Sequence, residues 1–126
     1  MLAILTCSFV FFVACTPTNN VRNITPQEAY KMMNSLDGFI IIDVRTATEF
    51  RQERIEHAIN VPYDTITQWA ESQLEKGLLQ KDTIILVYCQ RGRRSRIASQ
   101  RLVELGFTNI YDFGGIAYWS FNTISG

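Results

Sequence analysis

The chain has 126 residues, with 12 basic and 12 acidic side chains and a formal net charge of zero. This length fits one domain that buries a core of its own without disulfides. The balanced charge argues against a protein that binds nucleic acid over its whole surface. The arginines are nevertheless unevenly spread, because four of them lie within the six positions 91–96.

The first fifteen residues differ in character from the rest of the chain. Residues 2–14 are almost wholly apolar, a run too short to cross a bilayer as a helix of about 20 residues but suited to the apolar part of a signal peptide. The segment Phe12-Val13-Ala14-Cys15 resembles a bacterial lipoprotein processing box. That resemblance implies lipidation of Cys15, membrane attachment through the N-terminus and a periplasm-facing place in the cell envelope. A plain cleaved signal and an uncleaved anchor remain alternatives.

This interpretation divides the chain into a leader at residues 1–15, a tether at 16–21 and a domain at 22–126. Cys7 then belongs to the leader and Cys15 carries the lipid. Cys89 remains as the single free thiol of the mature chain, so no internal disulfide can form. A lone thiol outside the cytoplasm is a liability unless it has a use.

The first half of the domain predicts a helix, a buried strand and a short second strand. A capping box over 25–28 with proline at the first helical position starts a helix that we expect to end near Ser35. The apolar run 39–42 is typical of a strand buried on both faces, with Asp43 at its carboxyl end. A helical turn is expected at 48–51 and a short strand at 58–62.

The second half repeats the alternation. Asp64 or Thr65 is expected to cap a helix that Gly77 closes. A second buried strand at 83–88 ends at Cys89, a helix follows at 94–105, and a last short strand is expected at 109–113. Strands that alternate with helices predict an α/β domain with a mostly parallel central sheet and helices on both faces. Ligands of such sheets bind beyond the carboxyl ends of the strands, which is where Cys89 lies.

The loop after Cys89 carries the features of an anion site. The amides at a helix start have no partners within the helix, and the helix dipole adds partial positive charge there. Gly92 allows the loop to curl so that its amides form a cradle. These amides and the nearby arginines are expected to favour the thiolate form of Cys89, which is the nucleophile.

Cys89-x-x-Gly92-x-Arg94-Ser95 after a buried strand resembles the active-site loop of rhodanese-like domains. Three further segments resemble landmarks of that family in the same order, from about residue 21 to 122: 43–45 with 49–50, 55–62, and Gly114-Gly115 with Trp119. The second landmark departs from the pattern, because Glu53-Arg54 stands for Gly-His and His57 for a glycine.

The resemblance implies a sulfurtransferase that passes a sulfur atom through a persulfide on Cys89, from a small anion such as thiosulfate to a thiol or to cyanide. It implies no metal and no organic cofactor. The substrate-binding residues would be those that follow the cysteine: Gln90, Arg91, Gly92, Arg93, Arg94 and Ser95. We expect Arg94 to shape the loop more than to contact substrate, and Arg96 and Arg101 to lie on a solvated helix face.

Asp43 is expected to hold loop amides and to pair with an arginine such as Arg45, rather than to act as an acid or base. His57 matches a landmark residue without a chemical role, and Trp69 and Trp119 are expected in the core. Two other functions remain open. A phosphatase or arsenate reductase also uses a cysteine and an arginine, but with one more residue between them than the four that separate Cys89 from Arg94. A persulfide carrier or binding module without turnover needs the same Cys89.

Overall fold

The computed structural model describes residues 3, 6, 8, 10 and 20–126. The predicted lipidation site, Cys15, lies outside the described residues, as do most of the predicted leader at 1–15 and of the tether at 16–21. Within the described part of the chain, no helix has the length and hydropathy needed to cross a membrane.

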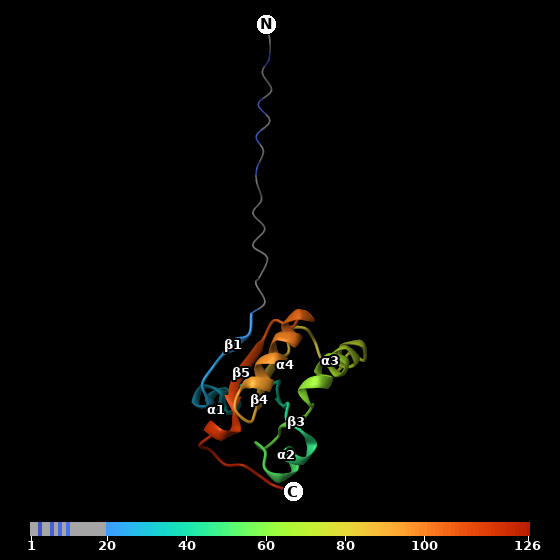
Figure 1. Cartoon of the computed structure of the whole chain (residues 1–126). Coiled ribbons are helices and arrows are strands. Elements are labelled where there is room, and N and C mark those ends of the chain that lie inside the picture. Colours follow the sequence, from blue (N-terminus) through green and yellow to red (C-terminus); the bar gives the residue numbers. More distant parts are fainter. Residues whose placement is uncertain (1–2, 4–5, 7, 9, 11–19) are drawn as a thin grey trace.

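A parallel sheet of five strands forms the centre of the domain (Figure 1). Its spatial order is β1-β5-β4-β2-β3. The strands are β1 (Arg22–Asn23), β2 (Phe39–Asp43), β3 (Ile59–Asn60), β4 (Ile84–Cys89) and β5 (Ile110–Gly115). All pairings are parallel, so the α/β fold with a central parallel sheet is as predicted.

Two hydrophobic clusters lie on opposite faces of this sheet. The alternation of side chains along β4 sends Ile85, Val87 and Cys89 to one cluster and Leu86 and Tyr88 to the other. The first cluster is covered by α3 (Ile66–Glu75) and α4 (Arg93–Glu104), and the second by α1 (Pro26–Ser35) and the C-terminal segment with η2 (Ile116–Tyr118). The predicted helices on both faces are therefore present, and Trp69 and Trp119 pack against the core as expected.

Two helices begin with the same capping box. In α1 the Thr25 hydroxyl accepts from the Glu28 amide, and the Glu28 carboxylate accepts from the Thr25 amide. In α2 (Ala47–Gln52), Thr46 and Glu49 make the same exchange. The first box was predicted, whereas only a helical turn was expected at the position of α2.

Thr65, one of the two residues predicted to cap α3, is at its N-cap position, but its side chain does not cap the helix. A 3₁₀ turn, η1 (Tyr63–Thr65), precedes this helix, and no side chain caps it. The Thr65 hydroxyl donates instead to the Pro62 carbonyl, three residues earlier, at 3.0 Å. Arg101 also departs from its predicted solvated position: its guanidinium donates to the Tyr63 carbonyl at 2.9 Å and so ties α4 to η1.

His57 has a positive φ of 68°, the only such value among the non-glycine residues that the structure describes. It occupies the position where the rhodanese-like pattern has glycine. A side chain with a Cβ is strained in this left-handed region. The chain therefore carries local backbone strain between α2 and β3, at a residue that is well exposed.

Candidate active site

Cys89 ends β4, with its side chain in the cluster under α4 and only 1% of the residue exposed. Its sulfur accepts a hydrogen bond from the Gly92 amide at 3.0 Å. Gly92, the N-cap of α4, has a φ of 108°, a conformation that only glycine adopts without strain. The curled loop thus brings a backbone donor onto the sulfur, as the loop sequence predicted.

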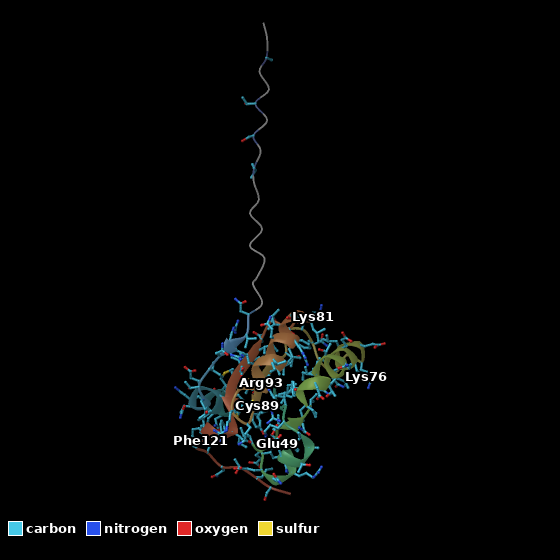
Figure 2. The ribbon with its side chains drawn as sticks, viewed as in Figure 1. Glu49, Lys76, Lys81, Cys89, Arg93 and Phe121 are labelled. Atoms are coloured by element: carbon cyan, nitrogen blue, oxygen red, sulfur yellow. The ribbon has the colours of Figure 1, made fainter. Side chains whose placement is uncertain are left out.

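A shallow pocket of about 250 Å³ opens at this sulfur. It is lined by Cys89, Gln90, Arg91, Arg93 and Arg94. Arg91 and Arg93 are exposed, and neither forms an ion pair with any residue in the described part of the chain. Five of the seven residues predicted for the site therefore form one pocket with cationic side chains at its mouth (Figure 2 labels Cys89 and Arg93).

Arg94 forms an ion pair with Glu49 of α2. Its Nη1 donates to Glu49 Oε2 at 2.8 Å, and its Nη2 donates to Oε1 at 2.9 Å. These hydrogen bonds outweigh the effect of burial and lower the pKa of Glu49 from 4.5 to about 2. The same bonds raise the pKa of Arg94. Arg94 therefore connects the loop to α2, in agreement with the expectation that it shapes the loop. It also lines the Cys89 pocket.

Arg45 connects β2 to the active-site loop. Its guanidinium donates to both carboxylate oxygens of Asp43, to the Glu53 carbonyl, and to Gln90 Oε1 at 3.2 Å. Asp43 is fully buried and also accepts from the Arg45 amide at 2.9 Å. The predicted pairing of Asp43 with Arg45 is present. Through its hydrogen bond to Gln90, Arg45 also links this pair to the loop that follows Cys89.

The rear of the loop rests on β5. The Ser95 hydroxyl bonds to the carbonyls of Gly92 and Gly114 at 3.1 and 3.3 Å. Asp112, which is 6% exposed, accepts from the Gly114 amide at 2.9 Å. Burial raises the pKa of Asp112, while the hydrogen bond from the Gly114 amide opposes that rise. Ser95 is thus a structural support rather than part of the pocket lining.

Comparison with known proteins explains this arrangement. The family model described as "Rhodanese-like domain" matches residues 25–122. The chain belongs to the rhodanese-like domain family.

Its relatives include sulfurtransferases of different sizes. The chain is 32% identical to "Thiosulfate sulfurtransferase PspE" of Escherichia coli over 60% of its own length and 68% of that protein. It is 30% identical to "Adenylyltransferase and sulfurtransferase UBA4" of Candida albicans over 82% of its length, but spans only 24% of that longer protein. The solved structure "rhodanese with anions from E. coli" matches with a TM-score of 0.60 and 29% identity, over 69% of this chain and 98% of the other.

A larger cavity in the rhodanese-like domain lies away from the cysteine. It measures about 490 Å³ and lies between α1, β2, the loop at 55–57 and the C-terminal segment, with Tyr30, Phe39, His57 and Phe121 among its lining residues. Neither a cysteine nor an arginine is among its lining residues. We therefore assign the chemistry to the smaller pocket, because of these two pockets only that one is lined by a thiol next to cationic side chains.

Two residues that support the rhodanese-like site were not predicted to do so, Glu49 and Asp112. Glu49 carried a sequence signal as the fourth residue of Thr-x-x-Glu at 46–49, which is the capping-box pattern. That pattern explains its place in α2 but not its bond to Arg94, which is 45 residues away in sequence. Asp112 gave no comparable signal.

Proposed function

We propose that this rhodanese-like domain is a sulfurtransferase enzyme that moves a sulfane sulfur through a persulfide on Cys89. The donor is thiosulfate or a similar small sulfur anion, and the acceptor is a thiol or, in the test tube, cyanide. The observation that carries the proposal is the Gly92 amide 3.0 Å from the Cys89 sulfur, in a pocket with unpaired Arg91 and Arg93. Relatives named thiosulfate sulfurtransferases support the same reaction class.

In the first step, the Cys89 thiolate attacks the outer sulfur of thiosulfate. A new S–S bond forms at Cys89, the S–S bond of thiosulfate breaks, and sulfite leaves with the electron pair. Arg91 and Arg93 attract the anionic donor to the pocket mouth. Charge-assisted hydrogen bonds from the loop amides, of which Gly92 is the one already on the sulfur, stabilise the persulfide that remains.

In the second step, an acceptor thiolate attacks the terminal sulfur of the persulfide. The bond between the two sulfurs on Cys89 breaks, the sulfur passes to the acceptor, and Cys89 returns as a thiolate. Cyanide takes the sulfur in the same way and becomes thiocyanate. No metal or organic cofactor is needed, because each step breaks one bond to sulfur and forms another.

The loop length favours this chemistry over phosphoryl transfer. Four residues separate Cys89 from Arg94, and the resulting pocket of about 250 Å³ is lined by five residues of a single loop. No carboxylic acid lines it to protonate a leaving alcohol. A persulfide carrier without turnover is the alternative, and measured turnover with a thiol acceptor separates it from the enzyme.

The deciding experiment is the intact mass of the purified protein before and after thiosulfate. We expect a gain of one sulfur atom, its loss on addition of cyanide, and no gain in a Cys89→Ser variant. A folded protein with a free thiol and no gain in mass would contradict thiosulfate as donor.

We further propose that Cys15 is lipidated and holds the domain at the periplasmic side of the cell envelope. The support is the sequence alone: an apolar run at 2–14 followed by Ala14-Cys15 and a polar stretch. Labelled fatty acid should enter the wild-type protein during expression in bacteria and should not enter a Cys15→Ala variant. Incorporation that survives this substitution would contradict the proposal.

A further inference from the structure

Arg94 is placed where a guanidinium would bind an oxyanion. It is the second residue of α4 and lines the Cys89 pocket. A planar guanidinium with two parallel N–H donors matches two oxygens of a sulfate or phosphate, which is why arginine is the usual residue for bidentate oxyanion recognition.

In this protein, however, both terminal nitrogens of Arg94 are already engaged. They donate to the two oxygens of Glu49 at 2.8 and 2.9 Å. Glu49 is itself held in place, because its Oε2 also accepts from the Thr46 amide at 2.8 Å and from the Thr46 hydroxyl at 3.0 Å. The carboxylate therefore occupies the fork that an oxyanion would use.

The pair also removes charge from the pocket. Arg94 and Glu49 have side chains only 24% and 30% exposed and together carry no net charge. The remaining positive charge of the pocket comes from Arg91 and Arg93, whose side chains are exposed. Their attraction to anions acts through solvent and is weakened by salt.

We propose that Glu49 determines the anion affinity of the Cys89 pocket by occupying the guanidinium of Arg94. Glu49 is thus a positioning residue that acts through Arg94. It keeps the binding of oxyanions in the pocket weak, so that an oxyanion product leaves readily. Its relevance to turnover rests on the proposed function, but the effect on anion binding does not.

The test uses sulfate as probe and the rate of Cys89 alkylation by iodoacetamide as readout, at constant ionic strength. Sulfate bound in the pocket protects Cys89, so the sulfate dependence of the rate gives a dissociation constant. In Glu49→Gln we expect sulfate to bind about tenfold more tightly, because a negative charge next to the site is removed and the Arg94 fork is released. The KM for thiosulfate should fall in parallel.

The matched control is Glu28→Gln. Glu28 makes the same capping box with Thr25 in α1, and it forms no ion pair with any residue in the described part of the chain. Its substitution should weaken a helix start to the same degree and leave the sulfate dissociation constant unchanged. Thr46→Ala loosens α2 while keeping both charges of the pair, and it should also leave that constant within twofold of wild type.

A double variant, Glu49→Gln with Arg94→Gln, separates this proposal from direct contact of Arg94 with the anion. Replacing a neutral pair by two neutral side chains should leave sulfate affinity within twofold of wild type. A roughly tenfold weakening in the double variant, or unchanged or weaker sulfate binding in Glu49→Gln, would overturn the proposal.

If Glu49→Gln does not fold, Glu49→Asp provides the second test. It keeps an acidic residue in the first turn of α2 but withdraws the carboxylate by one methylene, so tighter sulfate binding than in wild type is expected and unchanged binding contradicts the proposal. The proposed function can fail separately: sulfate binding can respond to Glu49 as described while thiosulfate adds no sulfur to Cys89.

Discussion

Gly115 at the end of β5 lies against the backbone of Gln90 in the active-site loop. A Cβ added at Gly115 would lie 2.2 Å from the Gln90 carbonyl oxygen and 2.7 Å from the Cα of Arg91. The backbone of Gly115 is extended, with φ at −132°. Glycine is therefore required at Gly115 because two backbone segments approach closely, and not because of its φ angle. At Gly92 the reason is the opposite, since its positive φ of 108° requires glycine.

We expect Gly115→Ala to displace the loop that carries Cys89. The carbonyl that it meets belongs to the backbone, so the clash can be relieved only by moving Gln90 and Arg91. We predict a loss of at least tenfold in kcat/KM for sulfur transfer from thiosulfate to cyanide, and a loss of about 1–3 kcal/mol in the free energy of unfolding. Steady-state kinetics and urea denaturation measure the two effects.

Gly114→Ala is the control for this substitution. Gly114 has a φ of 83°, but nothing lies within 4 Å of an added Cβ. Its substitution should therefore cost stability through backbone strain of about 1 kcal/mol while the loop stays in place. Equal activity in the two alanine variants would show that the contact of Gly115 with Gln90 does not set the loop position.

The buried pair of Asp43 and Arg45 yields a stability prediction. Arg45→Met would leave the fully buried carboxylate of Asp43 without its ionic partner and would remove the bond to Gln90. Breaking such a pair costs about 3–5 kcal/mol, because one charge remains buried and uncompensated. Chemical denaturation should show this loss, whereas Arg96→Met, at an exposed position on α4, should change stability by less than about 0.5 kcal/mol.

The parts of this fold that the sequence predicts are those with strong local patterns. The apolar runs of β2 and β4 mark strands buried on both faces, and the first capping box marks the start of α1. The edge strand β1 has two exposed residues, Arg22 and Asn23, and therefore no periodicity to detect. This strand forms because its backbone pairs with β5. A local sequence pattern does not reveal which strands pair.

The same distinction applies to the candidate site. The Cys89 loop is one continuous segment, in which Gly92 and the start of α4 contact residues only a few positions away in the sequence. Its geometry could therefore be inferred from the sequence. The bond between Arg94 and Glu49 joins two elements that are distant in the chain. The sequence contains both residues, but only the folded chain brings the side chain of Glu49 on α2 to that of Arg94 at the start of α4.

His57 provides a prediction in the opposite direction, a substitution that stabilises. Its φ of 68° is unfavourable for a residue with a Cβ. His57→Gly should relieve strain of about 1–2 kcal/mol and lose part of that gain to the greater freedom of glycine in the unfolded chain. We expect a net gain of about 0.5–1 kcal/mol in the free energy of unfolding, with unchanged sulfur transfer.

Thermal and urea denaturation measure this gain at His57. Glu56→Gly introduces the same flexibility one residue earlier, at a position without a positive φ, and should destabilise the protein instead. A loss of stability in His57→Gly as large as that in Glu56→Gly would mean that the strain at His57 is offset by contacts of its side chain.

The ion pair between Glu49 and Arg94 should be visible in the acid stability of the domain. Hydrogen bonds from Arg94, and to a smaller extent those from Thr46, lower the pKa of Glu49 from 4.5 to about 2 in the folded protein. A carboxyl group whose pKa is depressed on folding stabilises the protein fully above its unfolded pKa, and that stabilisation is lost as the pH falls toward the folded pKa. The difference in unfolding free energy between wild type and Glu49→Gln should therefore be constant from pH 7 to about 5.

Between pH 4.5 and about 2 this difference should shrink, as Glu49 becomes protonated in the unfolded chain and then in the folded one. Because the pair is partly exposed, we expect about 1–2 kcal/mol at neutral pH rather than the full value implied by the pKa shift. Urea denaturation at several pH values measures it, with Glu28→Gln as the reference for loss of a capping box alone. A difference that stays constant down to pH 2 would mean that the charged Glu49 carboxylate, held by Arg94 and Thr46, does not stabilise the fold.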